Sequence, residues 1–108
     1  LKKNREWNKN NSYIVAWRTV LKSQLRRMGK SKEGRTIELL GYSALELKEH
    51  IKSLFTEGMT WDNYGEWEID HKLPVSSFDK DTLPSIVNAL DNLQPLWQSE
   101  NRSKYNKY

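Results

Sequence analysis

The residues that could do acid–base or metal chemistry gather in the final third of the chain. His71, one of two histidines in 108 residues, directly follows the carboxylate of Asp70. A histidine accepts a proton near neutral pH because its unperturbed pKa is about 6.5, and a carboxylate is a ligand for hard cations. Asn92 and Asn101 add two amides further along. Taken singly, an Asp-His pair is common at strand ends and Asn92 is an ordinary turn residue, so the set must be considered together.

The chain contains no cysteine. This excludes disulfides, thiolate nucleophiles, zinc ribbons and iron–sulfur clusters. Any metal must therefore be held by oxygen or imidazole. Glu66, Glu68 and Glu100 could extend such a metal shell, although solvated surface carboxylates are commoner.

Charge is distributed unevenly along the chain. The net charge is +4, yet residues 1–35 hold eleven Lys or Arg against two Glu, a net +9, and the remainder holds seven against twelve, a net −5. A basic arm on an acidic body suits a polyanionic partner such as DNA, although a solvated basic face would look the same. The candidate DNA contacts are Arg18, Lys22, Arg26, Arg27, Lys30, Lys32 and Arg35, together with Arg102 and Lys104 near the end of the chain.

The first third predicts a basic helix after a polar lead-in over residues 1–11. Asn11 or Ser12 is a candidate N-cap, and Gly29 is a candidate stop. Residues 29–35 form a flexible basic connector. The apolar side chains that recur at helical spacing are Ile14, Trp17, Leu21, Leu25 and Met28.

The middle third predicts a second helix. A short apolar piece, 37–40, ends at Gly41, and Ser43 with Glu46 forms a capping box for a helix from Ala44 to about Phe55. Gly58 then closes this segment. The expected buried stripe is Leu47, Ile51, Leu54 and Phe55, and His50 is better explained as a packed structural histidine than as a second catalytic group.

Beyond residue 58 the pattern changes to that of a hairpin. Residues 61–65 form a turn, 67–73 alternate like a strand, and 93–97 form an edge or bulged strand because of Pro95. A polar loop, 76–81, and one or two helical turns within 82–90 separate the strands, and Ser99 caps a last helix from Glu100. Strict alternation would send Asp70 and His71 to opposite faces. We therefore expect pairing to end or bend there, as Pro74 suggests.

Two strings resemble the HNH endonuclease family, in particular its small phage-type and homing-type members. They are residues 67–78, WEIDHKLPVSSF, and 92–104, NLQPLWQSENRSK. The stretch 39–65 is also similar, so the resemblance covers about two thirds of the chain and leaves residues 1–35 outside. It implies an α+β protein with a ββα-metal (His-Me finger) site, in which a two-stranded hairpin and a helix grip one divalent cation, here preceded by helices. The expected organisation is one compact domain with a basic arm, 1–35, and a nuclease region, 36–108.

The resemblance also implies a role for each site residue. His71 would be the general base that activates water, and Asp70 and Asn101 would be the protein ligands of the metal. Asn92 would tie the long loop between the strands and so help to orient His71. Asn101 stands where the family name has its last His, and its neutral oxygen favours Mg²⁺ or Mn²⁺ over zinc.

The expected function is that of a metal-dependent endonuclease that hydrolyses phosphodiester bonds, in double-stranded DNA, by a one-metal mechanism. An alternative is a DNA-binding or phage-packaging module that keeps the fold without relevant cleavage; an RNA-binding protein would explain the basic arm but not the site. No apolar run approaches the 18 or so residues that a membrane span needs, and no signal-peptide core follows residues 1–5. We therefore expect a cytoplasmic protein, bacterial or phage-encoded, with no membrane partner.

Overall fold

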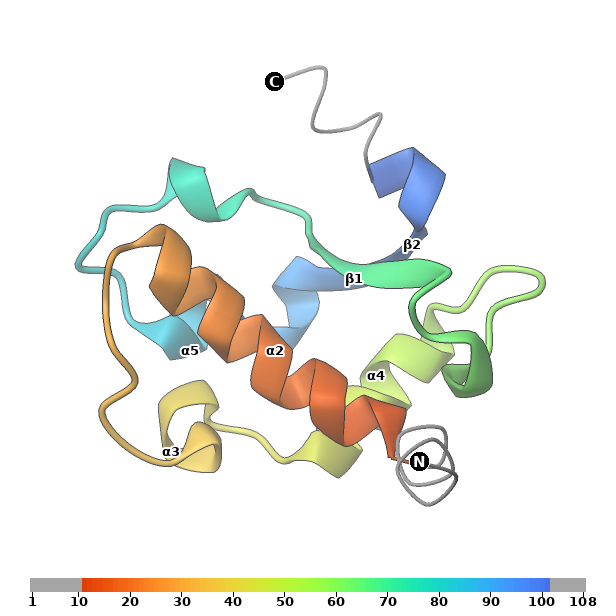
Figure 1. The fold of residues 1–108 in the computed structure, drawn as a ribbon, viewed down its shortest axis with the longest axis horizontal. Coiled ribbons are helices and arrows are strands. Elements are labelled where there is room, and N and C mark those ends of the chain that lie inside the picture. The colour runs from red at the N-terminus through yellow and green to blue at the C-terminus, as the bar shows by residue number, and fades with distance from the viewer. Residues whose placement is uncertain (1–10, 102–108) are drawn as a thin grey trace, which may run out of the picture.

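The computed structural model describes residues 11–101, which form a small α+β fold (Figure 1). The predicted lead-in up to Asn10 and the candidate DNA contacts Arg102 and Lys104 lie outside these residues. Single 3-10 turns occur at Trp61–Asn63, Val75–Ser77 and Leu90–Asn92, and residues 98–101 are helical. The helices and strands are α2 (Ser12–Arg27), α3 (Thr36–Leu40), α4 (Ala44–Ser53), β1 (Trp67–His71), α5 (Pro84–Val87) and β2 (Leu93–Trp97).

Helix α2 ends where the sequence predicts. Gly29 has a φ of 68°, and the amides of Gly29 and Lys30 donate to the carbonyl oxygens of Arg26 and Leu25. This is the glycine-ended arrangement that satisfies the last carbonyls of a helix. Of the apolar residues at helical spacing, Leu21 and Leu25 are buried, whereas Ile14, Trp17 and Met28 are half-buried. The buried face instead consists of Ser12, Ala16, Val20, Leu21, Gln24 and Leu25.

Helix α4 begins at the predicted capping box. Ser43 Oγ accepts from the Glu46 amide at 3.2 Å, and the Ser43 amide donates to Glu46 Oε1 at 3.1 Å. The helix is shorter than predicted, because it ends at Ser53 rather than at Phe55. Leu54 is 37% exposed, whereas Phe55 turns inward and its ring lies 5.1 Å from that of Trp67. Phe55 thus lies beyond the end of the helix and packs against Trp67.

The two strands form an antiparallel hairpin that pairs from Trp67 opposite Trp97 to His71 opposite Leu93. The Lys72 amide also donates to the Asn92 carbonyl oxygen at 2.8 Å. The expectation that pairing ends or bends at Asp70 is therefore wrong, although β1 ends two residues before the predicted Leu73. Pro95 takes a non-hydrogen-bonded position opposite Ile69, where the amide that proline lacks would face the free edge of β2.

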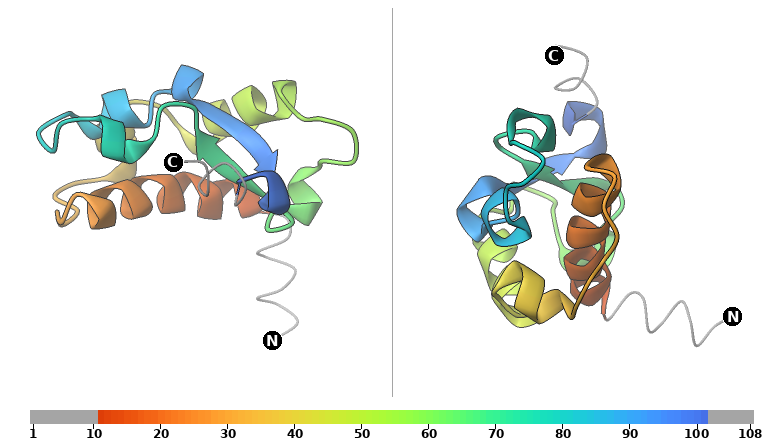
Figure 2. Two further views of the ribbon diagram at one scale, coloured as in Figure 1. Left: turned by 90° about the horizontal axis from the view of Figure 1, so that it is seen from above. Right: turned by 90° about the vertical axis from the view of Figure 1, so that its left-hand side faces the viewer.

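Helices and the last helical turn lie on opposite sides of this hairpin. Figure 1 and the right-hand view of Figure 2 both place α2 and α4 on one side and residues 98–101 on the other. The core between helices and hairpin is centred on the fully buried Trp67, whose ring lies 5.0 Å from Trp61 and 5.1 Å from Tyr64. No helix in the described part of the chain is long and apolar enough to cross a membrane.

The last helical turn begins earlier than predicted. Residues 98–101 are helical, so Ser99 lies inside the turn rather than at its cap. The Trp97 amide donates to Glu100 Oε1 at 3.3 Å, which is one half of a capping box with Trp97 in the cap position. Because β2 runs directly into this turn, Asn101 is brought back over the hairpin.

Candidate functional site at the edge of the hairpin

The outer face of the hairpin carries a buried carboxylate. Successive strand residues point to opposite faces, so Glu68 and Asp70 share the face turned away from α2. Asp70 is 1% exposed, and its Oδ2 accepts from Nε2 of Gln94, its partner directly across the hairpin, at 2.9 Å. Burial and the hairpin thus hold the Asp70 carboxylate in one place.

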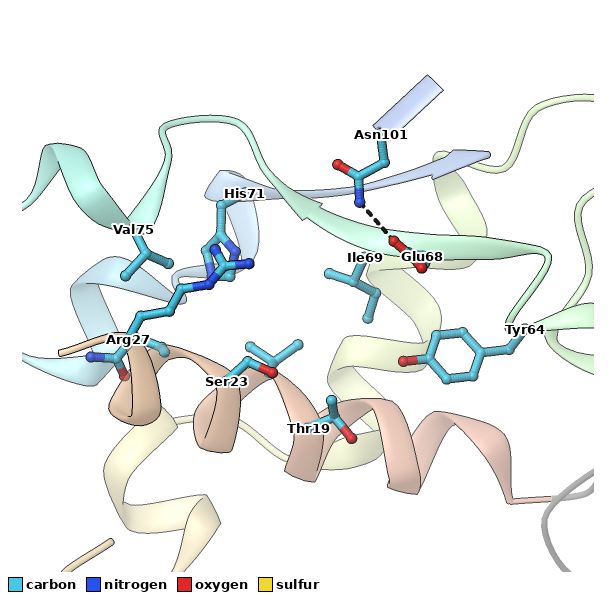
Figure 3. Close-up of a pocket in the computed structure, with 11 residues that line it drawn as sticks. Thr19, Ser23, Arg27, Tyr64, Glu68, Ile69, His71, Val75 and Asn101 are labelled. Carbon is cyan, nitrogen blue, oxygen red and sulfur yellow. Dashed lines mark hydrogen bonds between the residues drawn. The ribbon is translucent and has the colours of Figure 1, made fainter. Parts of the chain in front are cut away.

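Asn101 lies over the same face. Its Nδ2 donates to Glu68 Oε2 at 2.9 Å, and Gln98 Nε2 donates to Glu68 Oε1 at 3.3 Å. Asn101 Oδ1 is buried and has no hydrogen-bond partner within residues 11–101. In Figure 3 this oxygen is turned along β1 toward the end that carries His71, while the nitrogen faces Glu68. A buried amide oxygen without a donor is costly, so it is a candidate ligand atom.

The donor set on this face fits a hard divalent cation. The carboxylate of Asp70 and the Oδ1 atom of Asn101 are both oxygen ligands, which Mg²⁺ and Mn²⁺ prefer. No group of three or more His, Cys, Asp or Glu side chains that could hold a metal is found in residues 11–101. A cation here would therefore keep most of its positions for water and substrate oxygens, as Mg²⁺ commonly does.

His71 leaves the strand on the opposite side, toward α2. It is 8% exposed, and its Nε2 donates to Oδ1 of Asn88 at 2.6 Å. The other histidine has a structural contact, because His50 Nε2 donates to the Leu93 carbonyl oxygen at 3.1 Å. This contact agrees with the structural role predicted for His50.

Asn92 ties the loop between the strands at both of its ends. Its Oδ1 accepts from the Leu73 amide at 2.8 Å. Its Nδ2 donates to the carbonyl oxygens of Leu73 at 3.2 Å and Val87 at 2.9 Å. The tie that the family resemblance implies is thus present, and it holds the chain directly after His71.

A cavity of about 300 Å³ lies between β1 and α2 and contains both His71 and Asn101 in its lining (Figure 3). Glu68 and Ile69 also line it, although they are consecutive in β1 and point to opposite faces. The cavity therefore runs along the edge of β1 that faces away from β2, where residues from both faces of the strand line it. Asp70 does not line this cavity, so the cavity brings His71 together with Asn101 but not with Asp70.

The predicted DNA contacts between Arg18 and Arg35 are all exposed, and they differ in which hollow they line. Arg27 lines the cavity with His71. Arg26 and Lys30 line neither this cavity nor a second hollow of about 540 Å³ beside α2. Four cations gather around that second hollow, namely Arg18, Lys22, Lys32 and Arg35.

Sequence reasoning missed the polar side chains that support the site. Asn88, Gln24 and Gln94 look like ordinary surface residues in a linear reading, yet Asn88 is 0% and Gln24 is 1% exposed. A signal existed for Gln24, because it lies four positions after the buried Val20 on the packed face of α2. No local sequence pattern indicated that Asn88 or Gln94 would support the site.

Two tyrosines near this site, the buried Tyr42 and the half-buried Tyr64, have raised pKa values. Burial raises the pKa of Tyr42, whose hydroxyl donates to the Asn88 carbonyl oxygen at 2.7 Å. Burial, and then the negative charge of Glu68, raise the pKa of Tyr64, which lines the cavity. Both hydroxyls therefore stay protonated well above neutral pH.

Comparison with known proteins gives little functional information. No family model matches the chain, and no solved structure matches it. The chain is 32% identical over 93 residues to a protein of Acanthamoeba polyphaga mimivirus named "Uncharacterized protein L426". The match covers 82% of this chain but 41% of the mimivirus protein, so the chain spans about two fifths of that relative.

Proposed function

We propose that the chain is a metal-dependent DNA endonuclease of the HNH type that hydrolyses phosphodiester bonds. The observation that carries this proposal is that His71 and Asn101 line one cavity at the open edge of β1, together with the cation of Arg27. An imidazole, an amide oxygen and a fixed positive charge around one cavity suit a phosphodiester better than a neutral substrate. Such an enzyme would meet its DNA in the cytoplasm of a bacterial host, whether host- or phage-encoded.

His71 is the proton acceptor in this proposal. Hydrolysis of a phosphodiester requires a water molecule to lose a proton as it attacks the phosphorus. Nε2 of His71 carries a proton, because it donates to an amide oxygen that has none to give. Nδ1 is therefore the atom that takes the proton from water.

Asp70 and Asn101 would hold one divalent cation, with Mg²⁺ favoured and Mn²⁺ accepted. When bound, such an ion neutralises charge on the phosphate and on the leaving 3′ oxygen. Gln94 orients the Asp70 carboxylate, and Glu68 orients the Asn101 amide so that its oxygen is the atom left for a ligand. These two hydrogen bonds would orient the oxygens of Asp70 and Asn101 as ligands.

Arg27 and the cations around the second hollow would hold the DNA backbone. Arg27 lies at the cavity and suits the phosphate that is cut or its neighbour. Lys32 and Arg35 belong to the hollow beside α2 and suit phosphates further along the duplex. Contacts of this type add affinity without sequence preference.

The decisive experiment incubates supercoiled plasmid with the protein in Mg²⁺, in Mn²⁺ and in excess chelator. We expect nicked or linear DNA only with a divalent ion, and ends that carry a 5′-phosphate and a 3′-hydroxyl, because the 3′ oxygen is the leaving group. The His71→Ala variant, purified in the same way, controls for contaminating nucleases. Undiminished cutting in chelator, or equal cutting by this variant, would disprove the proposal.

A second candidate is a DNA-binding module that keeps the fold without cleaving, for example in phage packaging. The observation that favours it is the gathering of Lys22, Lys32 and Arg35 around a hollow that does not include His71. Tight plasmid binding without cleavage in any divalent ion would select this function. RNA binding has no comparable support from the described residues.

A further inference from the structure

We infer that Asn88 is a positioning residue that holds the neutral His71 ring in a single tautomer, with Nε2 protonated and Nδ1 as the basic atom. Gln24 and Met28 of the α2 region set the orientation of the Asn88 amide. The tautomer is a property of the folded chain, whereas its consequence for catalysis rests on the proposed function.

The inference starts from a chain of side-chain contacts that runs from the C-terminus of α2 to the end of β1. Gln24 Nε2 donates to Sδ of Met28, and Asn88 Nδ2 donates to Gln24 Oε1 at 3.2 Å. His71 Nε2 then donates to Asn88 Oδ1 at 2.6 Å. Asn88 and Gln24 are 0% and 1% exposed, so water does not compete for their amide groups.

The sulfur of Met28 determines which atom donates and which accepts in each of these hydrogen bonds. A thioether has lone pairs and no proton, so it can only accept, and the group of Gln24 that faces it must be the NH₂. Gln24 Oε1 is then the atom that faces Asn88, which must present its own NH₂ in return. The oxygen of Asn88 is left for His71, and only a protonated Nε2 satisfies it.

The backbone at Asn88 is held as firmly as its side chain. The Tyr42 hydroxyl donates to the Asn88 carbonyl oxygen at 2.7 Å, and the Asn88 amide donates to the carbonyl oxygen of Pro84 at 2.9 Å. Asn92 also donates to the carbonyl oxygen of the preceding residue, Val87. The loop before α4, helix α5 and the turn before β2 thus all fix the backbone from which the Asn88 side chain extends.

A fixed tautomer matters because only an unprotonated nitrogen can take a proton from water. In water a neutral imidazole exchanges between both tautomers, and a ring with Nδ1 protonated would present the wrong atom. Misplacement of a catalytic group by about 1 Å can cost roughly 10²-fold in rate. Asn88 prevents both the wrong tautomer and the misplacement of the His71 ring, and it does so without contacting the substrate.

The test reads the tautomer directly, by ¹⁵N-detected NMR of the histidine rings at a pH where they are neutral and without added metal. The chain has two histidines, so a His50→Gln variant assigns both sets of signals. We expect His71 to show one tautomer, with a slowly exchanging Nε2 proton and an unprotonated Nδ1. A protonated Nδ1, or rapid averaging between tautomers, would overturn the inference.

Variants of the hydrogen-bonded residues distinguish a positioning role of Asn88 from a general effect on stability. Asn88→Ala is expected to lose the protected Nε2 proton and to lower kcat by on the order of 10²-fold, with KM for DNA within about two-fold of wild type. Asn88→Asp keeps an acceptor for Nε2 and is expected to keep the tautomer. Ser85→Ala in α5 is the matched control and should change neither quantity. A wild-type tautomer in Asn88→Ala would refute the role of Asn88.

Gln24→Leu keeps the inference testable if Asn88→Ala fails to fold. Removal of the Gln24 amide frees Asn88 to turn its NH₂ toward His71, and we expect a mixture in which Nδ1 becomes protonated in part. An unmixed Nε2 tautomer in this variant would show that Gln24 does not set the direction. A single protected tautomer in a protein that cuts no DNA would reject the proposed function and leave the tautomer assignment standing.

Discussion

The amide of Asn101 donates to the carboxylate of Glu68 across 2.9 Å, although the two residues lie 33 positions apart. Gln98 donates to the other carboxylate oxygen, so Glu68 holds the last helical turn against β1 through two side chains. Because Nδ2 of Asn101 is committed to Glu68, Oδ1 is the atom left for a ligand. Glu68 thus selects which end of the Asn101 amide faces the site.

Removal of either proposed oxygen ligand, Asp70 or Asn101, should weaken metal binding. Asp70→Ala and Asn101→Ala are expected to raise the Mg²⁺ concentration needed for half-maximal cleavage by at least about ten-fold, the lower end expected when even a supporting hydrogen bond is removed. Glu68→Ala should act in the same direction because it releases the Asn101 amide. Calorimetric titration with Mn²⁺ checks the effect without DNA. The exposed Asp91 is the control, and wild-type titrations in all three variants would place the metal elsewhere.

His71→Ala should remove turnover and leave substrate binding intact. A general base acts mainly in the transition state and contributes roughly 10²–10⁴-fold to the rate. Single-turnover cleavage and DNA titration, measured side by side, check this separation. His50→Gln is the matched control, since the described partner of His50 is the Leu93 carbonyl oxygen and His50 does not line the cavity. A cleavage rate in His71→Ala close to wild type would remove the histidine from the mechanism.

The two groups of cations should respond differently to salt. The slope of log K against log salt falls by about 0.9 for each duplex phosphate that the protein no longer neutralises. Lys32→Ala with Arg35→Ala should therefore flatten the slope by about two and leave cleavage at saturating DNA unchanged. Arg27→Ala should flatten it by about one and also slow cleavage, because Arg27 lines the cavity of His71.

Lys52→Ala, in the exposed part of α4, is the control for the salt titration. If the double variant keeps the wild-type slope, the second hollow is a solvated face. DNA would then be held elsewhere, and Arg102 and Lys104 would be the next positions to test.

Stability should fall at alkaline pH because of Tyr42. Burial raises the pKa of Tyr42 above its ordinary value of 10.0, so above about pH 10 the unfolded chain loses this proton while the folded chain keeps it. The free energy of unfolding should then drop by up to about 1.4 kcal/mol per pH unit. Urea unfolding between pH 8 and 11, roughly the window around the ordinary tyrosine pKa, measures this slope. Tyr42→Phe should reduce it, and an equal slope in that variant would contradict the assignment.

Asn92→Ala should destabilise the whole fold. The Asn92 side chain makes three hydrogen bonds to backbone groups of the loop between the strands. At about 0.5–1.5 kcal/mol each, their loss should cost about 1.5–4.5 kcal/mol of unfolding free energy. Denaturant unfolding checks this, with the exposed Ser76→Ala as the control in the same loop. A loss below about 0.5 kcal/mol would show that the tie is dispensable.

Features that depend on near neighbours in the chain were predictable from the sequence. The capping box at Ser43, the glycine stop at Gly29 and the edge position of Pro95 all follow from groups within a few residues of one another. The hairpin was predictable because residues 67–73 alternate and Pro95 restricts the partner strand. Asp70, His71, Asn92 and Asn101 were predicted as site residues because they are polar groups that flank these elements and because the strings around them resemble a known motif.

Features that depend on distant partners were decided by the tertiary structure. The sequence predicted that Leu54 and Phe55 are both buried. Leu54 is exposed, whereas Phe55 is half-buried and packs against Trp67. Pairing continues through His71 because the loop that follows is tied to Asn92. Asn88 and Gln24 are 64 positions apart in the sequence. The orientation of the Asn88 amide, and with it the proposed tautomer of His71, is set only when the fold buries these two side chains against each other. A buried polar group must be satisfied by whatever the fold brings to it, and a linear sequence does not specify that partner.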